Sequence, residues 1–214
     1  MGFRIQLAMI ALAAGHIPAV LGQNWELGGG AGYGVARSNT VSFRGATGEA
    51  GLRRGYLATA YGAHHTYRHL SGELRYIYRQ GSPEVSAGGR QAQIAGETHT
   101  VNYDFLFHAR DREFGIRPYV AFGGGVKVFR GTGTESAFQP LSEFILLTRT
   151  RETLPLLSVG GGVSVRLAPG AVFRIDFRDH VTPFPSKVLQ PAPGAQLRGW
   201  LHDFVPLVSI GWRF

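Results

Sequence analysis

Beyond its N-terminal region, the chain alternates apolar and polar residues in eight long segments. In the fourth segment, for example, Val101, Tyr103 and Phe105 alternate with Asn102 and Asp104. A period of two is the spacing of a β-strand whose two faces meet different surroundings. The pattern predicts an all-β protein with strands at about 24–35, 55–65, 70–79, 98–108, 116–129, 156–167, 171–179 and 203–214. The second segment is less regular, and Leu57, Tyr61 and Ala63 are expected on its apolar face.

The length of these segments and of their connections points to a membrane. Most segments have about 9–12 residues, as a tilted strand needs to cross a bilayer, whereas globular strands usually have about 5–6. Short links near 66–69, 109–115 and 168–170 alternate with long ones near 36–54, 80–97, 130–155 and 180–202. Outer-membrane barrels combine short periplasmic turns with long extracellular loops. We therefore predict an eight-stranded antiparallel up-and-down transmembrane β-barrel with four long extracellular loops.

Glycine on the polar faces decides between this barrel and a soluble β-sandwich or lipocalin-like barrel, which also alternate. Solvent-facing strand positions gain nothing from glycine, which weakens a strand. Inside a narrow eight-stranded barrel, however, glycine makes room for larger side chains on neighbouring strands. An apolar exterior and a polar lumen are therefore expected. The glycines concerned are Gly28, Gly30, Gly32, Gly34, Gly123, Gly125, Gly160 and Gly162.

The first 22 residues have the features of a cleaved secretory signal peptide. Arg4 gives a positive charge, residues 5–14 form a short apolar run, and small residues near Gly22 offer a cleavage site, with Ala14 as the alternative. The predicted organisation is a signal peptide over 1–22 and one barrel domain over 23–214. No later stretch approaches the ~18 consecutive apolar residues of a transmembrane helix.

Composition narrows the functional classes. The absence of cysteine from the 214 residues excludes disulfides, thiol catalysis, cysteine-based metal sites and a lipoprotein anchor. The formal net charge is +8, but the basic residues are dispersed, with Arg53 and Arg54 as the only adjacent pair. An exported protein meets anionic lipid phosphates, so the charge indicates a membrane surface and no nucleic-acid partner.

Opposite charges on the polar faces are the candidate functional residues. Buried charges are costly unless partnered, so a narrow lumen should bring them together. We expect a salt-bridged polar plug, with a path for small ions or solutes as the alternative. The predicted network consists of Glu26, Glu73, Arg75, Asp104, Arg117, Lys127, Arg166, Arg174, Asp176 and Arg213.

Catalytic signals are weak. His69 and Ser71 form a His-x-Ser pair that resembles that of outer-membrane lipid A deacylases, but the rest of that signature is missing and His69 falls in a predicted turn. His64, His65 and His69 lack a metal-binding motif such as HExxH, and no phosphate-binding loop occurs. No catalytic residue, metal ligand or cofactor is predicted.

The end of the chain resembles the C-terminal strand of bacterial outer-membrane proteins, in which alternate residues are apolar and the last is aromatic. Val208, Ile210, Trp212 and Phe214 match this assembly signal, while Pro206 predicts irregular pairing. The glycine-rich strands look like those of the OmpA-like and OmpX-like small barrels. The resemblance implies an outer-membrane protein of a Gram-negative bacterium, with lipopolysaccharide and other outer-membrane lipid, periplasmic chaperones and the barrel-assembly machinery as partners.

The function predicted from these features is structural or surface-interacting, without enzymatic activity. A small passive pore for solutes is the alternative. A lipid A-modifying enzyme is a more distant one.

Overall fold

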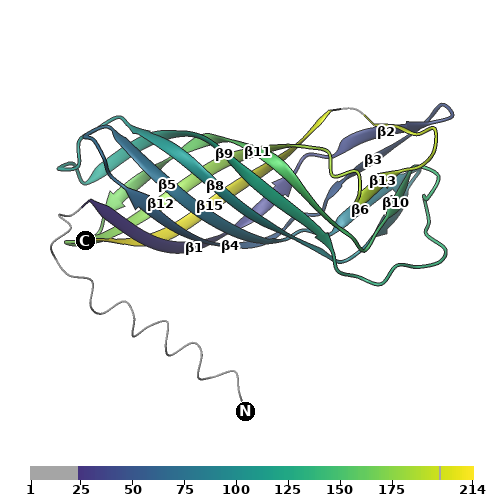
Figure 1. Ribbon diagram of the computed structural model, residues 1–214, viewed down its shortest axis with the longest axis horizontal. Helices are drawn as coiled ribbons and strands as arrows, with labels where there is room; N and C mark the ends of the chain where they lie inside the picture. Colours follow the sequence, from purple (N-terminus) through teal and green to yellow (C-terminus); the bar gives the residue numbers. More distant parts are fainter. Residues whose placement is uncertain (1–23, 198) are drawn as a thin grey trace, which may run out of the picture.

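The computed structural model describes residues 24–197 and 199–214, so the predicted signal peptide lies outside the described residues. Eight antiparallel strands form a closed barrel in the order β1-β15-β12-β11-β9-β8-β5-β4, with both ends of the described chain at one end of the barrel (Figure 1). Among the described residues no helix is long and apolar enough to cross a membrane. The barrel strands are β1 (Trp25–Ala36), β4 (Gly55–His64), β5 (Leu70–Gln80), β8 (Gly96–His108), β9 (Ile116–Gly131), β11 (Arg151–Arg166), β12 (Ala171–Pro183) and β15 (Trp200–Arg213).

These eight strands coincide with the eight predicted segments, but several extend further at the end opposite the termini. There β11 begins at Arg151 instead of residue 156, and β12 continues to Pro183 instead of residue 179. The ladder between β1 and β15 has a gap opposite Pro206, because a proline has no N–H to donate. The predicted irregularity at Pro206 is therefore confirmed.

The barrel has an apolar exterior, as predicted. Phe105, Phe122 and Ile210 point outward and are 48%, 54% and 61% exposed, whereas their sequence neighbours Asp104, Ala121 and Ser209 are buried inside. One strand was predicted wrongly. In β4, Leu57 and Tyr61 face the lumen, where Tyr61 donates a hydrogen bond to a carboxylate, and Ala58 and Ala60 face outward.

The glycines on the inner faces make room for lumen side chains, as predicted. A Cβ atom on Gly28 would lie 2.4 Å from the ring of Tyr61, and one on Gly34 would lie 2.5 Å from Nε of Arg79. Real Cβ atoms do not approach other atoms so closely, so an alanine at either position would displace the lumen side chain.

The four long connections form an ordered cap, which was predicted only as loops. Two tight hairpins, with turns at Arg44-Gly45 and Gly88-Gly89, have the positive φ angles of two-residue hairpin loops. The cap strands form a five-stranded sheet, β14-β2-β3-β6-β7, and a two-stranded sheet, β10-β13 (Figure 1). Their bounds are β2 (Asn39–Phe43), β3 (Ala46–Leu52), β6 (Pro83–Ala87), β7 (Arg90–Gln93), β10 (Ile145–Leu147), β13 (Leu189–Pro191) and β14 (Gln196–Leu197).

The cap has a hydrophobic core of its own, to which all four connections contribute. The short strands alternate as the barrel strands do, but their apolar side chains point into the cap and their polar side chains face outward. The buried residues of this cap core are Val41, Ala50, Val85, Ile94, Leu141, Phe144, Ile145, Leu147 and Leu189.

Candidate functional site

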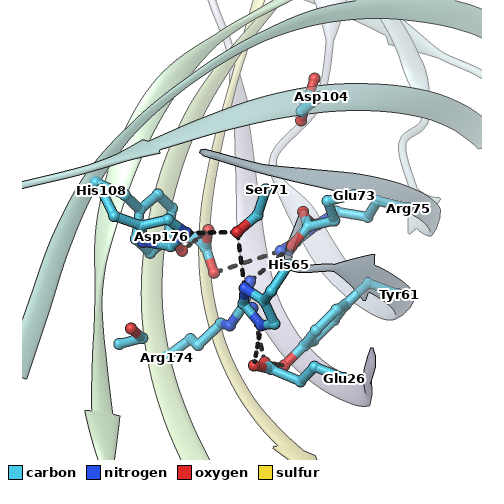
Figure 2. A network of polar contacts seen from close by, with 12 residues as sticks. Glu26, Tyr61, His65, Ser71, Glu73, Arg75, Asp104, His108, Arg174 and Asp176 are labelled. Atoms are coloured by element: carbon cyan, nitrogen blue, oxygen red, sulfur yellow. Dashed lines mark hydrogen bonds and ion pairs between the residues drawn. The ribbon is translucent and has the colours of Figure 1, made fainter. Parts of the chain in front are cut away.

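A network of buried charges crosses the lumen in the half of the barrel that lies nearer the termini (Figure 2). The network contains equal numbers of carboxylates and guanidinium groups. Every barrel strand contributes a side chain to it, and β4, β9 and β11 contribute the uncharged Tyr61, Tyr119 and Ser158. The charged members of this lumen network are Glu26, Glu73, Arg75, Asp104, Arg174, Asp176, Arg178 and Arg213.

Glu73 on β5 lies at the centre of the lumen network. Its carboxylate accepts hydrogen bonds from Nε of Arg75 at 2.8 Å, from Nη1 of Arg174 at 2.7 Å and from Nη2 of Arg178 at 3.3 Å. Arg174 also reaches Oε1 of Glu26 at 2.7 Å. A single arginine of β12 therefore joins carboxylates from β1 and β5 across the inside of the barrel.

The remaining members close the lumen network around this centre. Arg178 pairs with Asp104 and donates to Oδ1 of Asp176 at 3.0 Å, and Arg213 donates to Glu26 at 2.8 Å. Since an unpaired charge in a dry interior is costly, the mutual pairing stabilises a lumen that could not hold these side chains singly.

Two tyrosines fill the space between the charges. The guanidinium carbons of Arg75 and Arg174 lie 5.0 and 4.7 Å from the centre of the Tyr61 ring, within the range of cation–π contact. The hydroxyl of Tyr61 donates to Glu26 at 2.9 Å, and the hydroxyl of Tyr119 bonds to Asp176. The aromatic rings thus provide both packing and polar contacts.

Three further layers follow in the lumen towards the cap. Leu57, Ile77, Val205 and Leu207 form an apolar layer. Beyond it Asp203 pairs with both Arg79 and Lys127, and next to the cap Leu52, Phe129, Val188 and Leu201 form a second apolar layer. Charged and apolar layers therefore alternate along the lumen, and the cap covers the last of them.

At the end near the termini, the lumen network continues into a chain of hydrogen bonds (Figure 2). Ser71 Oγ lies 2.7 Å from Nδ1 of His65 and 2.9 Å from Nε2 of His108, and Nε2 of His65 lies 3.2 Å from Oε2 of Glu26. His65 lies in the turn between β4 and β5, where burial lowers its pKa. A neutral imidazole donates from one nitrogen and accepts at the other, which suits a relay from His108 through Ser71 and His65 to Glu26.

This relay contains a serine, a histidine and a carboxylate in hydrogen-bond contact, the groups of a nucleophilic triad. The environment of the relay, however, differs from that of a catalytic triad. Ser71 is completely buried and its hydroxyl is shared by two imidazoles, while Glu26 is also bound by two arginines. Nor does His69 share a face with Ser71: it is exposed in a turn and contacts Asp111 at 3.1 Å. In this arrangement the relay ties the turn residues to the lumen network.

The structure brings together seven of the ten charged residues predicted from the sequence, and places three elsewhere. Lys127 belongs to the separate cluster around Asp203. Arg117 is buried but bonds to the carbonyls of residues 68 and 110 instead of a carboxylate. Arg166 is exposed at the last residue of β11 and donates to the carbonyl of Arg112.

Sequence reasoning missed several members of the site. Arg178, Arg79 and Asp203 have the same strand parity as the predicted lumen charges, so alternation alone could have identified them. Tyr61 was assigned to the wrong face, and the position of His65 depends on turn geometry for which the sequence holds no signal. His108 ends β8 with the same parity as Asp104, so alternation places it in the lumen, but its contact with Ser71 could not be predicted. Among the described residues, no group of three or more histidine or acidic side chains is placed to hold a metal ion.

The comparison with known proteins identifies the fold. The chain is similar to the outer membrane protein OprG from Pseudomonas aeruginosa (TM-score 0.57, 12% identity, covering 90% of this chain and 97% of OprG). It is also similar to Neisserial surface protein A (0.53, 9%, 89% and 97%) and to AlkL in lipid bilayers (0.51, 13%, 93% and 95%). No protein-family model matches the chain, and no curated protein matches it in sequence.

The closed barrel with its apolar exterior defines a membrane-spanning β-barrel. The chain has the fold of the small eight-stranded barrels of bacterial outer membranes, and the prediction of an outer-membrane β-barrel is confirmed. At such low identity the likeness establishes the fold alone.

Proposed function

We propose that this protein is a structural, surface-presenting barrel, which is closed to solutes and holds its cap outside the cell. The observation that carries the proposal is the lumen network, in which all eight strands contribute to one buried and charge-balanced layer. A solute would have to break several of these ion pairs and then pass two apolar layers and the cap. Ion pairs in such surroundings are costly to separate.

The orientation follows from the connections. In outer-membrane barrels the short turns lie in the periplasm and the long connections outside. The cap contains the long connections, while both ends of the described chain lie at the other end of the barrel. We infer that the cap is extracellular and that it is the part of the molecule available to partners.

A chain without cysteine allows a direct test of this orientation. Gln91→Cys in the cap and Arg68→Cys in a turn at the other end each introduce one exposed thiol. We expect a membrane-impermeant maleimide to label Gln91→Cys on intact cells, and to label Arg68→Cys only after the cells are broken. The reverse pattern would show that the inferred orientation is wrong.

Conductance across a planar bilayer tests whether the lumen is closed. We expect no steady current through the unaltered protein, and a measurable current once Glu73→Ala and Arg174→Ala together remove the centre of the lumen network. The matched control is the exposed cap pair Arg90→Gln and Glu143→Gln, which lies 3.2 Å apart and far from the lumen. A steady current through the unaltered barrel that the lumen variant leaves unchanged would contradict the proposal.

Passive permeation remains the second candidate, and one observation favours it. Several buried lumen atoms, among them Nη1 of Arg75, Oδ1 of Asp104 and Nε of Arg174, have no hydrogen-bond partner among the described residues. Such atoms could bind small polar ions in passing, as the lining of a narrow pore does. The same conductance experiment separates this candidate from the closed barrel.

We also propose that the protein is not an enzyme. The argument is the surroundings of Ser71, whose hydroxyl is buried between two histidines, with no room for an ester or amide beside it. Lack of labelling of Ser71 by a fluorophosphonate, in protein kept folded in lipid, is the expected result. Labelling that Ser71→Ala abolishes would overturn this part of the proposal.

A further inference from the structure

A pocket of about 610 Å³ lies at the rim where the barrel meets the cap. On the barrel side it is lined by Trp200 and His202 of β15 and by Arg37, which follows β1. On the cap side it is lined by polar residues of β2 and β14. These residues lie on the face of the cap sheet that points away from the cap core. These cap residues are Thr40, Ser42 and Gln196.

The backbone holds the walls of this rim pocket in place. The N–H of Arg37 donates to the carbonyl of His202 at 2.8 Å, and Nδ2 of Asn39 donates to the carbonyl of Trp200 at 3.3 Å. Before Trp200, Gly199 has a φ of +105°, which side-chain-bearing residues rarely adopt, so glycine is required for the chain to turn into β15 here. A pocket whose walls are already ordered binds a ligand without the cost of ordering them.

The chemistry of the rim pocket fits a sugar that carries an anionic group. Trp200 is 60% exposed and offers a flat apolar ring, on which the C–H face of a pyranose can lie. The hydroxyl of Thr40 donates to Oε1 of Glu49 at 3.1 Å and can accept from a sugar hydroxyl. The hydroxyl of Ser42 and the amide of Gln196 can both donate and accept, as sugar hydroxyls require. Arg37 adds a guanidinium suited to phosphate. The described lining residues include no acidic side chain, while Glu49 bonds to Thr40 at 3.1 Å and Asp179 pairs with His202 at 2.8 Å just outside the lining.

The height of the rim pocket on the barrel indicates where such a sugar comes from. Trp200 and Trp212 are twelve residues apart on the outward face of β15, with Phe204, Val208 and Ile210 between them on the same face. At about 3.3 Å per residue and a tilt of about 40°, this separation spans about 30 Å along the membrane normal. The apolar band of such barrels is about 25 Å tall, so Trp200 lies at the level of the headgroups on the cap side.

We propose that the rim pocket binds the phosphorylated sugar headgroup of a glycolipid of the lipopolysaccharide type in the outer leaflet. The inference rests on the orientation proposed above, because only the outer leaflet of such a membrane presents this headgroup. It is independent of whether the lumen conducts. The headgroup stacks on Trp200, its hydroxyls bind the cap side, and its phosphate pairs with Arg37.

The fluorescence of Trp200 provides the test. The chain has three tryptophans, so Trp25→Phe with Trp212→Phe leaves Trp200 as the only one. This protein is placed in phosphatidylcholine vesicles and titrated with diphosphorylated lipid A. We expect a saturable change in emission, which phosphatidylglycerol, anionic but without sugar, does not produce. Arg37→Gln should weaken the apparent affinity about tenfold, since it removes a charge-assisted hydrogen bond.

A second measurement does not depend on fluorescence. Lipid A that remains on the purified protein after detergent exchange is quantified for Trp200→Ala, with Tyr56→Ala as the matched control. Tyr56 is an exposed aromatic on the outer wall at the same end of the barrel, but it does not line the rim pocket. We expect Trp200→Ala to lose the bound lipid and Tyr56→Ala to keep it.

Several results would overturn the inference. Equal responses to lipid A and phosphatidylglycerol would show general attraction to anionic lipid. Equal binding of soluble glucosamine 1-phosphate would show that the site does not select a membrane glycolipid. Retention of lipid A by the Trp200→Ala variant would show that Trp200 only anchors the barrel at the membrane interface and does not bind the headgroup. If Gln91→Cys is labelled from outside and yet no lipid A response is seen, the pocket proposal fails while the proposed function stands.

Discussion

The barrel and the cap differ in which kind of side chain they bury and which kind they expose. Inside the barrel the buried side chains include layers of charged residues and the outer surface is apolar, whereas the cap buries Val41, Ile145 and Leu189 and turns its polar residues outward. Both consist of antiparallel strands with alternating faces. At the rim, the buried face changes from polar to apolar within a few residues. The difference shows that the surroundings of each region, lipid or water, decide which set of alternate residues is buried.

The comparison predicts that an ion pair in the barrel matters far more than one in the cap. Arg174→Ala would leave Glu26 and Glu73 without their shared partner in a buried site, and should lower the free energy of unfolding by about 3–5 kcal/mol. Urea titration in lipid vesicles, followed by heat-modifiable gel mobility, measures this loss. Arg90→Ala removes the exposed cap pair with Glu143 and should change stability little. Equal losses would remove the contrast between the two regions.

In the cap the largest effect should come from the hydrophobic core instead. Leu189 is completely buried, so Leu189→Ala should destabilise the cap by about 2–5 kcal/mol. Limited proteolysis should then cut the cap faster while the barrel keeps its folded gel mobility. Leu146→Ala, in the strand that pairs with β13, changes a half-exposed leucine and serves as the control. If the barrel unfolds together with the cap, the two regions are not separate units.

A smaller effect is expected from the glycines that face the lumen. Gly28→Ala would place a methyl group 2.4 Å from the ring of Tyr61 and should cost about 1–3 kcal/mol, measured by the same urea titration. Gly115→Ala is the matched control, because no atom lies within 4 Å of the new methyl group. Similar stability of the two variants would mean that the lumen is less tightly packed than the distances indicate.

Sequence alternation was sufficient to predict the barrel, because a lipid-facing strand must keep its pattern over its whole length. In β8, Val101, Tyr103 and Phe105 stay in phase without a break, and the bounds were therefore predicted within two residues. In β4 the outward-facing Ala58 and Ala60 are not more hydrophobic than the inward-facing Leu57 and Tyr61. Where alanines face the lipid and a tyrosine faces the lumen, alternation cannot indicate which face of the strand points outward.

The cap and part of the candidate site could not be predicted for a different reason. Strands such as β2 and β6 have only five residues and depend for their burial on contacts with other connections that are distant in sequence. The lumen partners are likewise set by the closure of the barrel. Glu73 and Arg174 are 101 residues apart, and only the strand order brings them together.

The hairpin turn at Gly88-Gly89 gives the cap a practical use. Its two strands are fixed in a sheet drawn from several connections, and neighbouring strands lie about 4.8 Å apart. A short foreign peptide inserted between the two glycines would have both ends clamped at that spacing. In the proposed orientation the protein would then serve as a scaffold that displays constrained peptides on living cells.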